Sequence, residues 1–345
     1  MRTPLLGVVL VTGMCSMAFA QEPIKSNKKP YPTFGSIERL DPALDKLLAP
    51  DAKLEKLAEG FNWSEGPVWV ADGAYLLFSD VPENTVYRWT ERRGVDIYLK
   101  PSGYTGDPAE YDGKERGSNG LTLDAEGRLV LCQHGNRQVA RLADGGRFVP
   151  LADRYNGKRF NSPNDLCFDS AGNLYFTDPP YGLAKSAKKE IDFQGVYRVS
   201  PAPAPGGKVT LLTHELDRPN GIALSPDQKI LYVAQSHGPA PIIMAYEILS
   251  DGRLGEGRVL FDAKPLAEKG RKGMPDGLKV DQQGNLWATG PGGVLIISPE
   301  GKHLGSILTG EATANCAFGD DGSTLYITAD MYLARIKTNV KGTGF

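Results

Sequence analysis

The sequence predicts an all-β protein folded as a six-bladed β-propeller. One two-stranded pattern occurs six times along the chain, and each copy carries a polar residue at the same place, at positions 65, 119, 164, 220, 276 and 315. The intervals between these positions bracket the length of one four-stranded blade. The 345 residues include 41 glycines and 25 prolines, which suits a fold with many tight turns. Helical periodicity is sustained only at residues 42–57, enough for a turn or two of helix before the first blade.

Each copy has a polar residue, a short alternating strand, a turn rich in Asp, Gly and Asn, and a second apolar strand. This pattern is typical of two antiparallel strands joined by a tight turn. The copies are SEGPVWVADGAYLLFSD (64–80), GSNGLTLDAEGRLVLCQHG (117–135), FNSPNDLCFDSAGNLYFTDPPYG (160–182), RPNGIALSPDQKILYVAQSHG (218–238), MPDGLKVDQQGNLWATGPGG (274–293) and ANCAFGDDGSTLYITAD (314–330). Third strands are expected at residues 85–89, 137–142, 195–200, 242–249 and 293–298. We expect residues 53–61 to supply an outer strand to the last blade, which closes the ring.

The N-terminal segment, residues 1–20, has the layout of a cleaved secretory signal. It carries Arg2, an apolar stretch at residues 4–17, and Ala-Phe-Ala directly before Gln21. The apolar stretch is short and is interrupted by Thr, Gly and Ser, which argues against a membrane anchor. We therefore predict a signal peptide at residues 1–20, an N-terminal extension at 21–52, a propeller domain at 53–345, and a periplasmic or secreted location.

The charge balance narrows the range of partners. The formal net charge is −2 and the isoelectric point is near 6.2, so there is no basic excess for binding nucleic acid or an anionic membrane. A small, roughly neutral substrate fits better. The cysteines beyond the signal, Cys132, Cys167 and Cys316, lack CxxC spacing and predict neither a disulfide framework nor a zinc site. We expect them to be small buried hydrophobic residues.

Oxygen-bearing side chains occupy the same place in all six copies. Because the innermost strands of a propeller line its channel, these side chains are expected to point at one axis. Carboxylates and amides without His or Cys suit Ca²⁺ or a similar hard cation better than Zn²⁺. The alternative is that Asn and Asp begin each strand by bonding their own backbone, which six matching positions disfavour. The ring consists of Glu65, Asn119, Asn164, Asn220, Asp276 and Asn315.

A second circle of polar residues is expected where the returning strands end at the same mouth of the channel. His134 and His237 stand at equivalent ends of two blades. Each is therefore a candidate to contact a substrate or to orient a ligand, the alternative being a structural or solvated role. The circle consists of Asp80, His134, Asp178, His237 and Asp330.

The motifs SEGPVW, GSNGLTLD, NSPNDL, FTDPPYGL, RPNGIALSPD and MPDGLKVD occur in this order. Together they resemble the gluconolactonase/SMP-30/regucalcin family, and more closely its secreted bacterial gluconolactonases. The resemblance runs from about Asp41 to the C-terminus. It implies a six-bladed propeller with one catalytic divalent cation, for which Ca²⁺ is the best candidate and other divalent ions are possible substitutes. The implied ligands are Glu65, Asn164, Asn220 and Asp276, which leaves Asn119 to face the substrate and Asn315 to a structural role.

The resemblance implies the hydrolysis of a sugar lactone such as glucono-1,5-lactone. A cation on the lactone carbonyl polarises it and stabilises the charge that forms when water attacks. Asp276 is the candidate general base, because a carboxylate beside the cation can accept the proton of the water. His134 is the second candidate catalytic residue. No GxSxG motif occurs, which disfavours a serine nucleophile.

Asn119, His134 and Tyr104 are the candidate substrate-binding residues. Tyr104 lies in an insert at residues 101–117 that also carries Tyr111 and four glycines. Such a loop can fold over the mouth and recognise sugar hydroxyls, the alternative being a solvated connection. Two other functions remain open: a broader lactonase or phosphotriesterase-like hydrolase on the same metal site, and a binding propeller with a structural ion. Asn119, His134 and the insert disfavour the latter.

Overall fold

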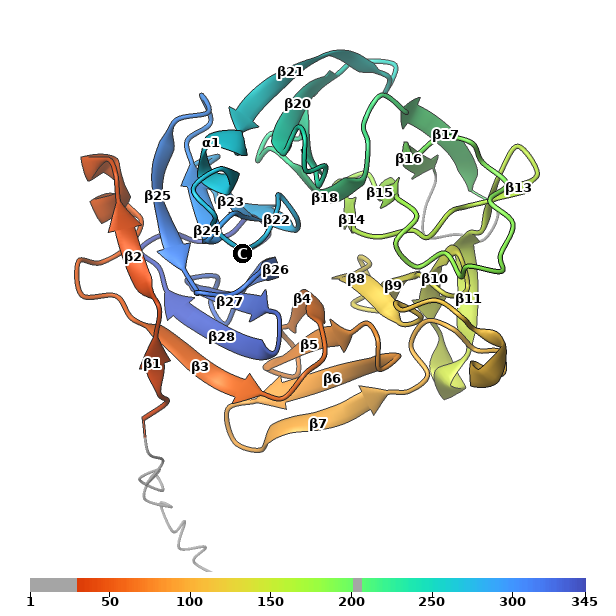
Figure 1. Cartoon of the computed structure of the whole chain (residues 1–345), viewed down its shortest axis with the longest axis horizontal. Helices are drawn as coiled ribbons and strands as arrows, with labels where there is room; N and C mark the ends of the chain where they lie inside the picture. Colours follow the sequence, from red (N-terminus) through yellow and green to blue (C-terminus); the bar gives the residue numbers. More distant parts are fainter. Residues whose placement is uncertain (1–29, 201–206) are drawn as a thin grey trace, which may run out of the picture. The chain divides into compact units, whose positions relative to one another are not determined.

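The computed structural model describes residues 30–200 and 207–345, and it confirms the all-β, six-bladed prediction. Residues 31–345 form one unit that holds every sheet. Figure 1 looks down this unit and shows the six sheets of four or five strands arranged around a common axis. The predicted signal peptide lies outside the described residues. Within the two described ranges, no helix has the length and apolar character that crossing a membrane requires.

Each blade is an antiparallel sheet whose strands follow one another from the channel outwards. All five predicted third strands are confirmed, and blades one to five each have a fourth strand that the sequence analysis did not place. In order, the blades are β4 (Ser64–Val70), β5 (Tyr75–Asp80), β6 (Thr85–Thr90) and β7 (Gly94–Leu99); β8 (Ser118–Leu123), β9 (Leu129–Gln133), β10 (Gln138–Leu142) and β11 (Phe148–Ala152); β14 (Leu166–Phe168), β15 (Leu174–Asp178), β16 (Gly195–Ser200) and β17 (Lys208–Thr213); β18 (Pro219–Leu224), β19 (Ile230–Gln235), β20 (Ile242–Ile248) and β21 (Leu254–Asp262); β22 (Leu278–Val280), β23 (Leu286–Gly290), β24 (Gly293–Ile297) and β25 (His303–Leu308); and β26 (Thr313–Gly319), β27 (Thr324–Ala329) and β28 (Tyr332–Lys337).

The N-terminal part of the chain closes the ring. β3 (Leu54–Glu59) pairs with β28, which confirms the outer strand predicted at residues 53–61. β1 (Thr33–Phe34) pairs with β3, and β2 (Ser36–Arg39) pairs with β25 at the edge of blade five. The segment set apart as an extension therefore adds strands to two blades, because an outermost strand leaves backbone groups that a further strand can satisfy. The remaining short elements are η1 (Pro42–Lys46), which gives the predicted turn of helix, η2 (Pro108–Glu110), η3 (Asp144–Gly146), β12 (Arg154–Tyr155), β13 (Lys158–Arg159) and α1 (Lys264–Ala267).

The hydrophobic core lies between the faces of neighbouring blades. Side chains alternate along β5, so that Leu76 and Phe78 pack against Tyr326 of blade six while Leu77 packs against Leu131 of blade two. Burying each such side chain contributes about 1.5–3 kcal/mol. Both faces of a blade are thus covered, which explains why its strands are apolar on both sides.

The cysteines behave largely as expected. Cys132 and Cys316 are fully buried and Cys167 is partly buried, and all three are free.

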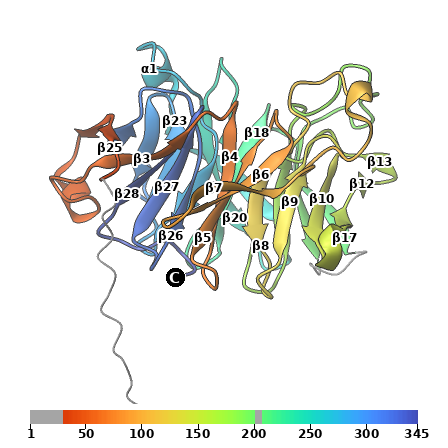
Figure 2. The ribbon, with the colours of Figure 1, turned by 90° about the horizontal axis from the view of Figure 1, so that it is seen from below.

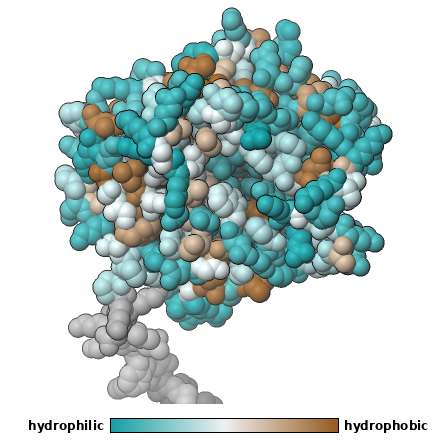
Figure 3. Space-filling model, viewed as in Figure 1, coloured by the Kyte–Doolittle hydropathy of each residue, from teal (hydrophilic) through white to brown (hydrophobic). Residues whose placement is uncertain are grey.

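The channel has two distinct ends. Figure 2, at right angles to Figure 1, shows α1 at one end and the C-terminus at the other. Figure 3 shows the face seen in Figure 1, where hydrophilic residues predominate and hydrophobic ones are scattered. Below, the end that carries α1 is called the front and the end that carries the C-terminus is called the rear.

Candidate active site

The inner strands lose their regular pairing at the ring position. In β4 and β18 the register shifts between Glu65 and Val68 and between Pro219 and Ile222, and β8 and β26 show similar shifts. Such a bulge redirects the side chain at the shift. The repeated irregularity therefore aims the ring residues into the channel.

Glycines directly after the ring residues let neighbouring blades approach closely. Gly66 has a φ of +50°, and a Cβ added there would lie 2.1 Å from the carbonyl oxygen of Asn119. A Cβ on Gly221 would lie equally close to the carbonyl oxygen of Asp276. A larger residue would push the blades apart, so these glycines bring the ring residues together. The same position is glycine in four of the six blades: Gly66, Gly120, Gly221 and Gly277.

Hydroxyl groups fix the backbone of the ring from the neighbouring blade. Ser79 on β5 donates a hydrogen bond to the carbonyl of Asn119 at 2.9 Å, and Thr177 on β15 donates to the carbonyl of Asn220 at 2.7 Å. Both hydroxyls are buried. The ring is therefore held by bonds between blades as well as by bonds within each blade.

A cavity of about 250 Å³ lies at the front end of the channel and is called the front cavity. Glu65, Asn119, Asn164 and Asn220 are buried in its wall, and Asp276 is partly exposed there. The structure thus brings together all four predicted metal ligands and one predicted substrate residue. The rest of the lining is Trp63, Glu115, Tyr181, Ser236, Gly273, Met274, Ala312 and Thr313.

Four oxygens in the wall of the front cavity are buried without a hydrogen-bond partner. They are the Oδ1 atoms of Asn119, Asn164, Asn220 and Asp276. Buried polar atoms in folded proteins nearly always have a partner, because an unsatisfied one is costly. Oxygen atoms that converge without donors are a suitable coordination set for a hard cation. The residues present therefore fit the cation that the resemblance implies.

The acidic side chains around the front cavity repel one another. Burial, and next the charge of Asp165, raise the pKa of Glu65 to about 8. Burial, and next the charge of Glu65, raise the pKa of Asp276 well above its usual range. A divalent cation would remove this penalty by compensating the charges. In the described parts of the chain, His, Cys, Asp and Glu side chains alone do not form a metal-binding group of three, so the amide oxygens are needed to complete the set.

Asn315 lies beneath the front cavity and holds carboxylates in place. Its Nδ2 donates to Glu65 Oε2 at 3.1 Å and lies 3.4 Å from Asp165 Oδ2. The same Oε2 accepts the backbone N–H of Gly66 at 2.7 Å. Asn315 therefore fixes the orientation of Glu65, in line with the structural role expected for it. Asp165 was not singled out in the sequence, although it breaks the glycine pattern of the ring.

His134 and Tyr104 do not line the front cavity. The His134 ring is fully buried, with Nε2 at 3.4 Å from Asn164 Nδ2 and Nδ1 at 3.4 Å from Glu115 Oε2. Tyr104 packs beside Tyr111 with ring centroids 5.1 Å apart, and its carbonyl accepts a hydrogen bond from Asn84. His134 thus reaches the cavity through the side chain of Asn164.

The 101–117 insert is attached to the front of the protein by specific bonds. The Tyr111 hydroxyl donates to the carbonyl of Gly182 at 2.7 Å, and Asp112 accepts from the backbone of Ser186 at 3.0 Å. These bonds place Glu115 in the wall of the cavity. Glu115, Tyr181, Trp63 and Ser236 also line the cavity and were not predicted from the sequence. Of these, Ser236 follows the end of β19 as His134 follows the end of β9.

Two carboxylates of the outer circle organise the loops that lead into the ring. Asp80 accepts the backbone N–H groups of Asn62 and Trp63, each at 3.1 Å, just before Glu65. Asp178 does the same for Asn161 and Ser162, each at 2.8 Å, just before Asn164. His237 instead pairs with Asp217 at 2.9 Å and does not line the cavity.

Comparisons with known proteins point to one family. Residues 63–330 match the family described as the SMP-30/Gluconolactonase/LRE-like region. A gluconolactonase of Zymomonas mobilis is 42% identical over 318 residues, which cover 90% of this chain and 88% of the relative. A pentonolactonase of Haloferax volcanii is 25% identical and covers 76% of this chain and 80% of the relative. The solved structure of a gluconolactonase from Xanthomonas campestris is 33% identical, with a TM-score of 0.77, and covers 90% of this chain and 99% of that chain.

Proposed function

This chain belongs to the SMP-30/gluconolactonase/LRE-like family, and from this membership we propose that it is a lactonase that hydrolyses the ring ester of a sugar lactone. The relatives named gluconolactonase and pentonolactonase support the substrate class. The observation that carries the proposal is the front cavity, where four unpartnered oxygens converge beside Glu65. The cavity is small, and several polar groups converge in its wall, as is typical of a small-molecule site.

We propose that Glu65, Asn164, Asn220 and Asp276 hold one divalent cation. Two carboxylates and two amide oxygens favour Ca²⁺ and allow other hard divalent ions. When bound, the cation would polarise the lactone carbonyl and stabilise the negative charge that develops on its oxygen. Asn119 contributes a further unpartnered oxygen in the same wall, which can accept a hydrogen bond from a sugar hydroxyl.

Asp276 is the proposed general base. Its Oδ1 has no hydrogen-bond partner, and the neighbouring Asn220 side chain offsets a small part of the rise in the pKa of the carboxyl group. In the charged form, this carboxylate can take the proton of the water that attacks the carbonyl. Trp63 and Tyr181 line the remaining wall and restrict where the substrate ring can lie.

His134 is proposed as a positioning residue. Its Nε2 faces the nitrogen of the Asn164 amide, so it can hold that amide with the oxygen toward the cation. The tautomer with its proton on Nδ1, the ring nitrogen 3.4 Å from Glu115 Oε2, leaves Nε2 free to accept from Asn164. Tyr104, which packs in the insert, supports the same loop without touching the cavity.

We also propose that the protein is exported to the periplasm or beyond. The support is the sequence of residues 1–20, with Arg2, the apolar stretch and the Ala-Phe-Ala site before Gln21. N-terminal sequencing of protein recovered from the periplasm would test it. A mature chain that begins near Gln21 is expected, and an N-terminus that still begins at Met1 would contradict export by cleavage.

A substrate panel with control of the cation tests the proposed activity. Proton release would be measured with glucono-1,5-lactone, pentonolactones, a lactone without hydroxyl groups and a phosphotriester, with the spontaneous rate subtracted. We expect hydrolysis of the sugar lactones that is lost on chelation and restored by Ca²⁺. Faster phosphotriester hydrolysis would favour the phosphotriesterase alternative. Cation binding without turnover of any substrate would favour a binding propeller.

A further inference from the structure

A second cavity, of about 430 Å³, lies at the rear end of the channel and is called the rear cavity. All six inner strands contribute to it, as do residues 343–345 at the C-terminus. Its volume is within the range typical of small-molecule sites. Nothing in the proposed lactonase chemistry uses this space, because the cation ligands face the front cavity.

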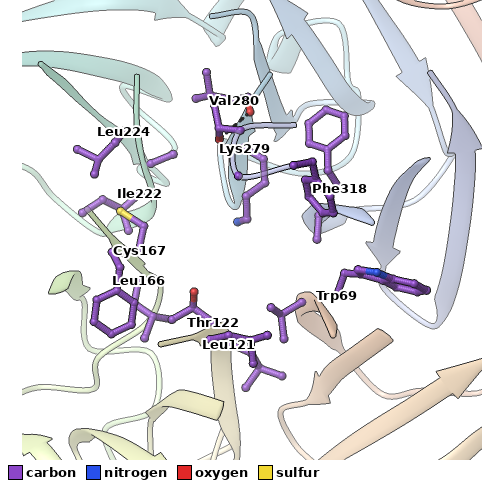
Figure 4. A pocket seen from close by; sticks show the side chains of 18 of the residues that line it. Trp69, Leu121, Thr122, Leu166, Cys167, Ile222, Leu224, Lys279, Val280 and Phe318 are labelled. Atoms are coloured by element: carbon purple, nitrogen blue, oxygen red, sulfur yellow. Dashed lines mark hydrogen bonds between the residues drawn. The ribbon is translucent and has the colours of Figure 1, made fainter. Parts of the chain in front are cut away.

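One position of the repeat gives the rear cavity a single charged side chain among small or apolar ones. Three residues after the ring position, five blades carry Val68, Thr122, Cys167, Ala223 and Phe318. In blade five the same position is Lys279. Small or apolar side chains thus surround one ammonium group. Figure 4 shows the amine of Lys279 directed into the middle of the cavity, with Leu121, Ile222 and Leu224 around it.

The ammonium of Lys279 is only partly satisfied by the protein. Its Nζ donates to the carbonyl of Leu278 at 3.1 Å and to Asn315 Oδ1 at 3.4 Å, both of which are neutral acceptors. Burial raises the pKa of Asp165, and the charge of Lys279 offsets part of that effect from a distance. Within residues 30–200 and 207–345, however, Lys279 makes no ion pair. An ammonium has three donors, so one N–H remains for an anionic group.

We propose that the rear cavity binds a small amphipathic carboxylate. The carboxylate head pairs with the Lys279 ammonium, and the apolar body lies against Leu121, Ile222 and Leu224. A charge-assisted hydrogen bond in an apolar surrounding is among the stronger polar contacts. A polyhydroxylated acid fits less well, because the hydroxyl groups that face Leu121, Ile222 and Leu224 would have no partner there. This site is separate from the front cavity and does not depend on the proposed reaction.

Calorimetric titration of the Ca²⁺-loaded protein with 3-phenylpropanoate tests the proposal. We expect one saturable site whose affinity falls at least about tenfold in Lys279→Met, which keeps most of the side-chain length and removes the charge. The uncharged 3-phenylpropanamide should bind to the unaltered protein as weakly as 3-phenylpropanoate binds to Lys279→Met. Lys208→Met, at an exposed lysine on β17, is the matched control and should bind the carboxylate normally. Unchanged affinity in Lys279→Met, or no saturable binding to the unaltered protein at millimolar probe, would overturn the proposal.

Tryptophan fluorescence locates the probe even if Lys279→Met fails to fold. Trp69 lines the rear cavity and Trp63 lines the front cavity. We expect the fluorescence response to 3-phenylpropanoate to persist in Trp63→Phe and to disappear in Trp69→Phe. Gluconate, a hydroxylated acid, should not displace the probe. Loss of the response only in Trp63→Phe, or displacement by gluconate, would place the probe in the front cavity and contradict the proposal.

Discussion

The imidazole Nε2 of His134 lies 3.4 Å from the side-chain nitrogen of Asn164. The oxygen of the same amide is buried in the wall of the front cavity without a partner. An Asn amide can be turned either way, and a neighbour that accepts from its nitrogen decides which way the oxygen points. We infer that His134 determines the orientation of the Asn164 amide, which is a proposed cation ligand.

His134→Ala is therefore expected to weaken the binding of the cation. Partners that orient a ligand typically contribute about 10- to 100-fold in metal affinity, so a loss on that scale is expected, with turnover largely recovered at saturating Ca²⁺. Calorimetry gives the affinity and steady-state kinetics gives kcat. His237→Ala is the control, because His237 lies two residues beyond the end of β19, pairs with Asp217 and does not line the front cavity. A kcat that stays low at full cation occupancy would instead indicate direct contact with the substrate.

Asn164→Ala and Asn220→Ala should each weaken cation binding while the protein stays folded. Each change removes one neutral oxygen from the wall of the front cavity and leaves both carboxylates. The loss should be about tenfold or more, since even indirect partners of a metal reach that size. Titration with Ca²⁺ measures the affinity, and a thermal melt shows whether each variant stays folded. Affinity equal to that of the unaltered protein in both variants would remove these residues from the ligand set.

The ring of site residues was predictable because a repeat places equivalent residues at equivalent points. Glu65, Asn164, Asn220 and Asp276 meet in one cavity for that reason. Asp165 could have been predicted in the same way, since it replaces the glycine found after the ring residue in four blades. Residues that a single loop brings into the site could not be predicted from the repeat.

Glu115 is an example of such a residue. Its place in the cavity wall depends on bonds such as that from Tyr111 to Gly182, 71 residues away. Short-range sequence patterns do not predict a contact between residues that are so far apart in the chain. The outer strands β1 and β2 were likewise not predicted, because pairing with β3 and β25 depends on which blade edges are left open.

Cation affinity should fall as the pH is lowered. Burial and the charge of Asp165 raise the pKa of Glu65 to about 8, with a smaller contribution from Glu115. Below about pH 8 a proton therefore competes with the cation for this carboxylate. As the pH decreases from about 8 to 6, we expect the affinity for Ca²⁺ to fall. In the same pH range, the binding of Ca²⁺ should release protons. Titrations in two buffers with different ionisation enthalpies measure both, and an affinity independent of pH would contradict this account.

The same shift predicts how the stability of the cation-free protein depends on pH. Glu65 binds its proton more tightly when folded, with a pKa of about 8, than at its ordinary value of 4.5. Its contribution to stability is therefore fully present below about pH 4.5 and is lost as the pH rises through 8. Added Ca²⁺ should restore stability at the alkaline end. Melting temperatures measured with and without chelator between about pH 4.5 and 8 test whether the stability of the cation-free protein falls as the pH rises.

Asp178→Ala should destabilise the fold. The carboxylate accepts two buried backbone N–H groups, from Asn161 and Ser162, and bonds to a charged acceptor contribute about 1.5–3 kcal/mol each. Because burial raises the pKa of Asp178 to about 7, the measurement belongs above that pH, where we expect the free energy of unfolding to fall by about 3–6 kcal/mol for the two bonds together. Urea denaturation measures it, with Asp178→Asn as the milder control because an amide oxygen remains. A change within about 0.5 kcal/mol would show that the loop does not need this acceptor.

The proposed reaction gives Asp276 two roles, as a cation ligand and as the general base. Asp276→Asn separates them, since the amide keeps one oxygen for the cation but does not accept the proton of the water. Asp165→Asn is a matched control, because Asp165 is also a buried carboxylate near Glu65 but does not line the front cavity. Saturating Ca²⁺ should restore kcat in the control.

The value of kcat for Asp276→Asn at saturating Ca²⁺ is the most direct test of the proposed mechanism. Positioned general bases contribute about 10²- to 10⁴-fold in rate. We therefore predict that kcat on the best sugar lactone stays at least about a hundredfold below that of the unaltered protein, even when calorimetry shows the cation site to be full. Recovery of kcat to near the unaltered value would contradict the account and leave Asp276 as a ligand only.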